Sequence, residues 1–309
     1  MGNSGPIPLG ACSFLPGHRP CASRRGAVCP TARGLARPGR GDFILRQPLC
    51  PCPGRSPLAW PDHAPWRPRL SARLGRAPGA RVSDLNPHWR PIRSFVLRTG
   101  RETPGQARAR EALGARYAIP WPEASLPTDY WDRCFDVEGP LTLEIGFGMG
   151  GSLAAMAAAE PMRRFLGVEV HTPGVGALMA ALDAQQLTNV RVLQGDVVAA
   201  LDHLFQPGAL DRVQIFFPDP WPKKRHHKRR LIQPSFLERL APFVRPGGHC
   251  WLATDWAPYA EAMEAAFAAV PAWRRLPADA CPPRPETRFE RRGLRKGHAV
   301  TDLYFERLP

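Results

Sequence analysis

The fold is decided by residues 141–151, which read LTLEIGFGMGG. A short apolar run leads into closely spaced glycines, and SLAAMAAA at 152–159 continues as a predicted helix. In a strand–turn–helix unit, glycines permit a tight turn and the close approach of a ligand, and the helix N-terminus favours anionic groups. The glycines are spaced as G-x-G-x-G-G, whereas nicotinamide-dependent enzymes typically show G-x-G-x-x-G. The stretch therefore predicts a ligand-binding turn at the end of a buried strand.

Strands and helices alternate from this turn to the C-terminus. Further strands are expected at 165–170, 190–193, 211–217, 248–254 and 299–307. Further helices are expected at 174–186, 197–204, 234–243 and 257–270. Such alternation predicts an α/β fold with a parallel sheet and helices on both faces.

Acidic residues stand at the ends of four predicted strands. Glu144 comes just before the glycines, and Glu169 ends the second strand 23 residues after Gly146, where a doubly wound fold holds ribose hydroxyls. Asp196 follows the third strand at a position suited to an adenine edge, and Asp219 follows the fourth. Each acid alone could be a solvent-facing or turn side chain. Because ligands bind outside the carboxyl ends of parallel strands, four acids in register predict one shared crevice.

Residues 1–89 differ from the rest of the chain in composition. They hold 15 of the 37 prolines, 13 Arg, no Lys and 3 acidic residues, whereas residues 90–309 hold the other 29 basic and 24 acidic side chains. Proline removes hydrogen-bond donors and fixes φ, so such a segment cannot build a hydrogen-bonded core. We interpret 1–89 as a disordered or spurious N-terminal extension and 90–309 as the folded domain. A transit peptide and a nucleic-acid-binding arm remain alternatives for the extension.

The overall charge of the 309-residue chain, +15, favours a polyanionic partner and salt-sensitive binding. No stretch approaches the roughly 20 apolar residues that a membrane helix needs. The N-terminus lacks the continuous apolar region of a secretory signal. The eight cysteines are irregularly spaced and match no zinc pattern. We therefore expect a cytoplasmic protein that holds no metal and does not associate with membranes.

The densest basic run of the chain, PKKRHHKRR at 222–230, begins directly after the Asp219 turn. A charge run is usually only a solvated face, but beside a crevice it offers contacts to RNA phosphates. Two nearby residues have open interpretations. Trp221 could stack on a base or pack in the core. Asp255, at the end of the fifth strand, could face the crevice or cap the following helix.

Several segments between about residue 90 and the C-terminus together resemble the bacterial tRNA (guanine-N7)-methyltransferases. The combination is highly specific, and residues 1–89 have no counterpart in it. The matching segments are RSF at 93–95, TGR at 99–101, LEIGFGMG at 143–150, GVEVH at 167–171, FFPDPW at 216–221, Lys223 with the basic run after it, ATDW at 253–256 and TRFE at 287–290.

This resemblance implies a Rossmann-like class I methyltransferase fold, with a mostly parallel sheet and an antiparallel strand near the C-terminus. It implies S-adenosylmethionine as the cofactor and tRNA as the partner, with N7 of the variable-loop guanine (nucleotide 46) as the acceptor. No obligate protein partner is expected, and a monomer and a homodimer both remain open. Cofactor contacts are implied at Glu144, Gly146, Gly148, Glu169, Asp196 and Asp219, and substrate contacts at Lys223, Asp255, Thr287, Arg288, Phe289 and Glu290.

One residue departs from the family pattern. Arg288 stands where Lys is common, and the two side chains are not equivalent at a bidentate or stacked contact. A Lys contact of the family would therefore take a different geometry at Arg288.

Asp219 is the predicted catalytic residue if this resemblance holds. Guanine N7 carries a lone pair and no proton, so its attack on a sulfonium methyl group needs no general base at N7. Positioning should dominate, with the reacting atoms in line and roughly 3–3.5 Å apart. The methylated guanine gains positive charge, which a carboxylate could stabilise, or the carboxylate could orient the base through its N1–H and N2 amine.

Three alternatives remain open. The Asp-Pro-Trp sequence after the fourth strand is similar to the [DNS]-P-P-[YF] turn of amino-group methyltransferases that act on adenine or cytosine, although here Pro220-Trp221 replaces Pro-Pro-aromatic. A nicotinamide-dependent dehydrogenase is disfavoured by the glycine spacing and by the lack of a suitable catalytic motif. A non-enzymatic RNA-binding protein is disfavoured by the intact acids, although a fold alone never proves function.

Overall fold

The computed structural model describes residues 93–95, 100–295 and 297–309. All of them belong to one of the two units into which the chain divides, Pro57–Pro309. The predicted extension at 1–89 lies outside the described residues, as does 96–99 in the segment that opens the family resemblance.

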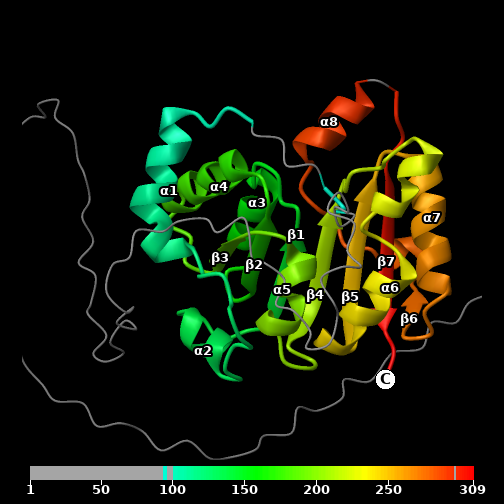
Figure 1. The fold of residues 1–309 in the computed structure, drawn as a ribbon, viewed down its shortest axis with the longest axis horizontal. Helices are drawn as coiled ribbons and strands as arrows, with labels where there is room; N and C mark the ends of the chain where they lie inside the picture. The colour runs from blue at the N-terminus through cyan, green and yellow to red at the C-terminus, as the bar shows by residue number, and fades with distance from the viewer. Residues whose placement is uncertain (1–92, 96–99, 296) are drawn as a thin grey trace, which may run out of the picture. The chain divides into compact units, whose positions relative to one another are not determined.

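A seven-stranded sheet forms the centre, with the strand order β3-β2-β1-β4-β5-β7-β6 (Figure 1). The parallel strands are β1 (Leu141–Ile145), β2 (Arg164–Glu169), β3 (Val190–Gln194), β4 (Leu210–Phe216) and β5 (Val244–Thr254). β7 (Thr301–Arg307) runs antiparallel to β5, and β6 (Trp273–Arg275) antiparallel to β7. The predicted fold class, a mostly parallel sheet with an antiparallel C-terminal strand, is confirmed. From β1 the chain adds β2 and β3 on one side of the sheet, and it then crosses over to add β4 and β5 on the other side. Ligands bind in such folds at this switch point between β1 and β4.

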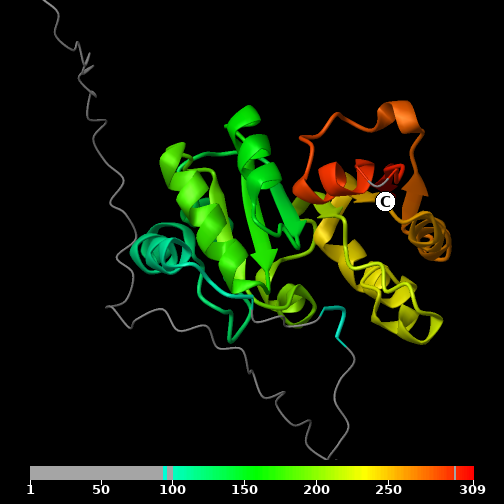
Figure 2. The ribbon, with the colours of Figure 1, turned by 90° about the horizontal axis from the view of Figure 1, so that it is seen from above.

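Helices cover both faces of the sheet, and each face has its own apolar cluster. On one face the cluster draws on α2 (Tyr130–Cys134), α5 (Val197–Leu204), α6 (Pro234–Leu240) and α7 (Ala257–Ala268). On the other face it draws on α1 (Pro104–Tyr117), α3 (Gly151–Ala159) and α4 (Thr172–Ala184). Viewed from above, the yellow and orange α6 and α7 lie on the opposite side of the sheet from the green α3 and α4 (Figure 2). An eighth helix, α8 (Arg288–Leu294), precedes β7.

The central strand β1 is buried along its whole length. Leu141, Leu143 and Ile145 point into the cluster beneath α5 and α7, so Thr142 and Glu144 alternate to the other face. A strand between parallel neighbours is covered on both sides, which explains why its sequence is nearly continuous in apolar residues. Glu144 interrupts that run, and it is one of the few buried acids of the described residues.

Four elements were not predicted from the sequence: α1, α2, β6 and α8. The sequence of α1, PGQARAREALGARY, mixes Ala and Gly with charged residues and buries only Gly114 and Tyr117, so it has no sustained helical period of large apolar residues to detect. Its start is nevertheless specified locally. Thr103 and Gln106 form a capping box in which the Gln106 N–H donates to Thr103 Oγ1 at 3.3 Å and the Thr103 N–H donates to Gln106 Oε1 at 2.9 Å.

The predicted helix at 234–243 ends earlier than expected. The α-helix α6 stops at Leu240, and Ala241–Phe243 form a short 3-10 turn. Pro242 has no N–H to donate, so it cannot continue the helical hydrogen-bond pattern. No helix among the described residues is both long and apolar enough to cross a membrane.

We predict that Leu143→Ala destabilises the protein by about 2–5 kcal/mol, because Leu143 is fully buried in the central strand and its loss leaves a cavity. The free energy of unfolding would be measured by urea denaturation. Met162→Ala is the matched control, since the side chain of Met162 is 64% exposed, and it should change the free energy by less than about 0.5 kcal/mol. Equal effects of the two substitutions would contradict the assignment of Leu143 to the core.

Candidate functional site

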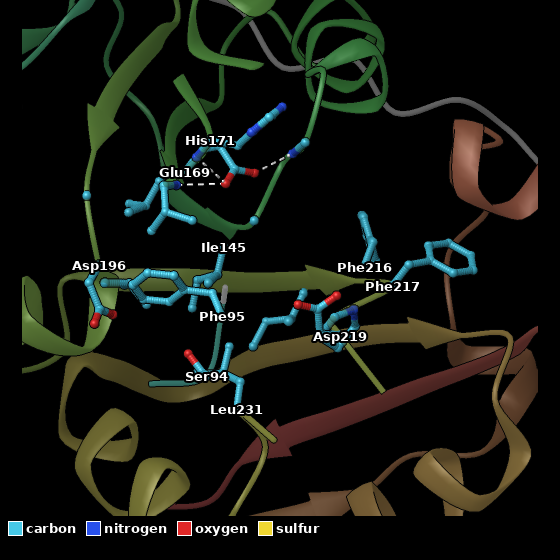
Figure 3. A pocket seen from close by; sticks show the side chains of 18 of the residues that line it. Ser94, Phe95, Ile145, Glu169, His171, Asp196, Phe216, Phe217, Asp219 and Leu231 are labelled. Atoms are coloured by element: carbon cyan, nitrogen blue, oxygen red, sulfur yellow. Dashed lines mark hydrogen bonds between the residues drawn. The ribbon is translucent and has the colours of Figure 1, made fainter. Parts of the chain in front are cut away.

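A pocket with a cavity volume of about 350 Å³ opens at the carboxyl ends of β1, β2, β3 and β4. This volume lies within the range of roughly 300–1,000 Å³ that is usual for ligand pockets. In Figure 3, Asp196 and Asp219 lie at opposite ends of the pocket, with Glu169 between them on one side. The lining residues are Ser94, Phe95, Ile145, Gly146, Gly148, Val168, Glu169, Val170, His171, Gly195, Asp196, Val197, Ile215, Phe216, Phe217, Pro218, Asp219, Leu231 and Phe289.

The glycine loop between β1 and α3 contributes backbone rather than side chains to this pocket. Gly146, Gly148 and Gly150 have φ angles of +77°, +59° and +76°, which side-chain-bearing residues rarely adopt. Helix α4 packs directly on the loop, because a Cβ atom built on Gly174 would stand 2.0 Å from the Gly148 carbonyl oxygen. The loop is therefore held in a conformation that brings its backbone close to any ligand in the cavity.

Glu169 is fastened by backbone N–H groups on both of its carboxylate oxygens. Gly148 donates to Oε2 at 2.7 Å, and Val170 and His171 donate to Oε1 at 2.7 and 2.9 Å. Burial raises the pKa of Glu169 above its ordinary value, and the N–H groups of His171, Gly148 and Val170 act in the opposite direction. A carboxylate offers about four acceptor positions, so three donors still leave room for a ligand hydroxyl.

Asp196 lines the pocket and also begins α5. Its Oδ1 accepts a hydrogen bond from the Val198 N–H at 3.0 Å, which makes Asp196 the N-cap of that helix. The apolar walls between Glu169 and Asp196 come from Val168 and Val197. The arrangement suits a flat, partly apolar group with hydrogen-bonding edges.

Asp219 is exposed at the end of a strained turn. Phe217 and Trp221, on either side of the Pro218–Asp219–Pro220 segment, have φ angles of +52° and +45°. Such conformations cost on the order of 1–3 kcal/mol each for residues other than glycine. They persist because the turn is fastened: the Phe217 N–H donates to the Ala253 carbonyl at 2.7 Å. At the other end, Arg230 Nε donates to the Pro220 carbonyl at 2.9 Å.

Trp221 supports the pocket rather than presenting a free ring to it. Its Nε1 donates to the Ser94 carbonyl at 3.1 Å. The guanidinium of Arg229 lies 5.0 Å from the centre of the ring, and His226 meets the ring edge-on at 5.8 Å. Of the two interpretations of Trp221, the structure therefore favours packing, with the opening segment and the basic run as its neighbours.

Glu144 does not line the pocket. It is 3% exposed and lies opposite Gln214 in the β1–β4 ladder. In the amide orientation that satisfies both neighbours, Gln214 donates to Glu144 Oε2 at 3.2 Å and accepts from Arg212 Nε at 3.0 Å. Burial raises the pKa of Glu144 to about 8, against the opposing effect of the Arg212 charge. At neutral pH the carboxyl is therefore mostly protonated, and it lies in the buried strand β1 just before the glycine loop.

Arg284 fastens α8 over the pocket. Its Nη1 contacts Glu290 Oε2 at 2.5 Å and its Nε contacts Asp302 Oδ1 at 2.7 Å. The guanidinium also lies 5.4 and 5.3 Å from the ring centres of Phe216 and Phe217, so one buried cation joins α8, β7 and the end of β4.

Phe289 of α8 is the aromatic residue that this arrangement places at the pocket rim. It is 59% exposed, yet it lines the pocket beside the glycine loop. A Cβ atom built on Gly148 would stand 3.7 Å from its ring. An exposed ring beside a cavity is suited to contact a flat ligand.

The other predicted substrate residues surround the pocket without lining it. Lys223 is exposed at the start of the 3-10 helix η2 (Lys224–Arg229), and Arg288 is exposed at the first position of α8. Thr287 caps α8 in a capping box with Glu290. Asp255 contacts His298, with 3.2 Å between Oδ2 and Nδ1. Asp255 does not cap α7, as one interpretation had it: the N-cap is Trp256, whose side chain makes no capping hydrogen bond and whose N–H donates to Thr254 Oγ1 at 3.2 Å.

A family model described as "Putative methyltransferase" matches residues 138–303, more than half of the chain. The tRNA (guanine-N(7)-)-methyltransferase of Burkholderia vietnamiensis is 51% identical over 230 residues, which cover 73% of this chain and 89% of that protein. The enzyme of the same description from Burkholderia pseudomallei is 49% identical over 250 residues, covering 80% and 93%.

The chain belongs to the tRNA (guanine-N7)-methyltransferase family. The resemblance stated from the sequence is thereby confirmed. Among solved structures, the 16S rRNA methyltransferase KamB is similar at 17% identity over 60% of this chain and 95% of that chain, with a TM-score of 0.44. A likeness at this level carries no argument about function.

Some pocket residues of this tRNA methyltransferase family member were not predicted as site residues from the sequence. The family resemblance includes Ser94 and Phe95 but assigns them no contact. The sequence indicates no site role for Phe217 or Leu231. Arg284, which fastens α8, was also missed. The strained backbone at Phe217 and the fourfold contact of Arg284 arise only when distant segments meet, so no local pattern indicates them.

We predict that Glu144→Gln removes a pH-dependent loss of stability from this methyltransferase. The folded-state pKa of about 8 lies above the ordinary value of 4.5. The stability that the protonated group contributes is therefore fully present below about pH 4.5 and is lost as the pH rises through about 8. The wild type should lose stability relative to Glu144→Gln over this window, by at most about 1.4 kcal/mol per pH unit. Urea denaturation at several pH values would measure this, and parallel curves would contradict the prediction.

We also predict that Arg284→Met destabilises the protein by on the order of 3 kcal/mol, because it leaves the carboxylates of Glu290 and Asp302 without their shared cation. Hydrogen exchange should show lost protection in α8. The control is Arg274→Met, which breaks an ion pair between an exposed Arg and Glu306 and should cost less than about 1 kcal/mol. Unchanged protection of α8 in Arg284→Met would show that the guanidinium does not hold this helix.

Proposed function

We propose that this chain transfers the methyl group of S-adenosylmethionine to N7 of a guanine in tRNA, namely nucleotide 46 in the variable loop. The observation that carries the proposal is the single pocket that joins Glu169 and Asp196 to Asp219 and Phe289. The first two residues suit a nucleoside and the second two suit a base at the opposite end. Family membership supports methylation of guanine N7 in tRNA, which is what the names of the relatives state.

The pocket fits S-adenosylmethionine. Glu169 retains acceptor capacity for ribose hydroxyls beside its three backbone donors. Asp196 and the neighbouring valines would hold the adenine edge, and Gly146 and Gly148 leave space for the chain that carries the sulfonium. When bound there, the cofactor supplies a methyl group on a positively charged sulfur. Glu144 would act only indirectly, through the strand that leads into the loop, since it does not line the cavity.

Asp219 is proposed as the catalytic residue. Bound in the pocket, the cofactor would supply the methyl carbon to the lone pair of guanine N7 and would keep the electron pair of its carbon–sulfur bond. No proton leaves N7, so Asp219 is not needed as a base there. Its carboxylate would face the guanine as the base becomes positively charged, or hold its N1–H and N2 amine. The strained turn fixes the position of Asp219, which is the requirement when alignment dominates the barrier.

The exposed basic residues near the rim would meet the RNA. Lys223 and the following run lie next to the Asp219 turn, and Arg288 lies on α8 beside Phe289. Contacts between such side chains and phosphates supply affinity and orientation without reading the sequence. Phe289 would contact the splayed-out guanine through its ring.

We predict that Asp219→Ala lowers kcat for methyl transfer by about 10²–10³-fold, the usual loss when a group that stabilises developing charge is removed. The full-length chain would be incubated with unmodified tRNA and a radiolabelled methyl donor. Borohydride–aniline cleavage, which breaks RNA at N7-methylguanosine, would then map the modified nucleotide. Cleavage is expected at the variable-loop guanine.

Asp279→Ala serves as the matched control, because Asp279 is an exposed acid in a 3-10 turn outside the pocket. It should methylate tRNA at the wild-type rate. Label incorporated without cleavage would show a different acceptor atom and favour an amino-group methyltransferase. Cofactor binding with no incorporation would favour an RNA-binding protein without this activity.

A further inference from the structure

A second pocket, which we call the basic pocket, adjoins the first. Its cavity volume is about 360 Å³. It shares Ser94, Asp196 and Leu231 with the first pocket, and these three residues lie on the side of Asp196, away from Phe217, in Figure 3. Its lining is completed by Arg93, Val198, Lys228, Arg229, Arg230, Gln233, Ser235, Phe236 and Arg239.

The charge of the basic pocket is one-sided. Five cationic side chains line it, and Asp196 is the only acid among the lining residues. The positive charges of Arg93 and Arg239 act on Asp196 to lower its pKa, against the larger effect of burial, so both lie close to it. No ion pair joins Arg93, Lys228 or Arg229 to another residue of the described part of the chain, whereas Arg239 is paired with Asp202. The pocket therefore carries a net positive charge that the described residues do not neutralise.

Arg230 is the buried cation among the five. Its side chain donates from Nε to the Pro220 carbonyl and lies over the ring of Tyr259 at 4.6 Å. The residue is 6% exposed, and its Nη2 has no hydrogen-bond partner among the described residues. An unpaired donor on a buried cation is costly in a folded protein. Arg230 also lines the basic pocket, so its charge would attract an anion there.

The other cations are held in place by their surroundings. Arg229 lies over the ring of Trp221, whose Nε1 bonds to the Ser94 carbonyl. Arg239 is oriented by two bonds from Nε to the carboxylate of Asp202, at 3.0 and 3.1 Å. Side chains fixed in this way lose little further freedom when they bind an anion, which favours a defined site over a diffuse patch.

Resting on the proposed function, we propose that the basic pocket binds a backbone phosphate of the RNA substrate. A phosphodiester is a compact anion with several acceptor oxygens, which arginine side chains recognise well. S-adenosylmethionine is a poor match, because it has no phosphate and its one carboxylate is outweighed by its ammonium and sulfonium groups. Since the two pockets share a wall, a phosphate held here would set the distance between the RNA backbone and the guanine at Asp219.

The test uses the full-length protein with Arg93→Gln and Arg239→Gln, two variants that remove one cation each from different elements. Binding of unmodified tRNA would be measured by filter binding over a range of salt concentrations, and methyl transfer would be followed separately. Each variant should raise the Kd for tRNA roughly tenfold and make the slope of log K against log salt shallower by about one. The Kd for S-adenosylmethionine should not change.

Arg274→Gln is the matched control, since Arg274 is an exposed Arg paired with Glu306 on the far edge of the sheet. It should bind tRNA like the wild type. Urea denaturation would establish that the variants are folded, and Arg93, which is exposed at the rim, keeps the test valid if Arg239→Gln is unstable.

Three outcomes would overturn the proposal. Wild-type tRNA affinity and salt slope in both pocket variants would show that no phosphate contact is made there. Weakened binding of S-adenosylmethionine with unchanged tRNA binding would assign the pocket to the cofactor. If inorganic phosphate competes with tRNA for the protein but neither substitution changes the Kd for tRNA, the pocket is a site for the free ion only. A protein that binds tRNA through these residues but transfers no methyl group would support the phosphate site and contradict the proposed function instead.

Discussion

The hydrogen bond from the Gly148 N–H to Glu169 is the contact on which the site depends, because it joins the loop after β1 to the end of β2. Two constraints meet in it. The loop must adopt left-handed conformations at alternate glycines, and its backbone must lie against α4 at Gly174 with no side chain between them. Only then does the Gly148 amide reach the carboxylate. The rest of the pocket is arranged around this junction of β1, β2 and α4.

The opposite end of the pocket is organised by buried arginines rather than by backbone amides. Arg230 fastens the turn that carries Asp219, and Arg284 ties the end of β4 to α8 and β7. Both guanidinium groups also lie against aromatic rings, which suits a planar and weakly hydrated cation. Rigid placement of Asp219 and Phe289 is what a reaction governed by alignment requires.

Charge is distributed in layers around the site. A neutral Glu144 lies in the strand before the glycine loop, acids line the cavity, and arginines and lysines surround its rim. This distribution of charge suits the proposed reaction. The acids face a cationic cofactor and a base that becomes cationic, while the outer cations meet the polyanionic RNA. The basic pocket extends the outer layer inward to the wall of the first cavity.

The sequence alone determined the fold class, the glycine loop and the grouping of Glu169, Asp196 and Asp219, because these follow from local periodicity and from the rule that parallel strands end at one edge. The family resemblance also followed from short segments of sequence. Tertiary structure decided four features that periodicity does not indicate. They are the helix α1, the burial of Glu144 away from the cavity, the ion pairs that Arg284 makes with Glu290 and Asp302, and the basic pocket. Each of these depends on side chains far apart in the chain that meet only after folding. Their burial, protonation and partners are properties of that assembled environment and not of any local pattern.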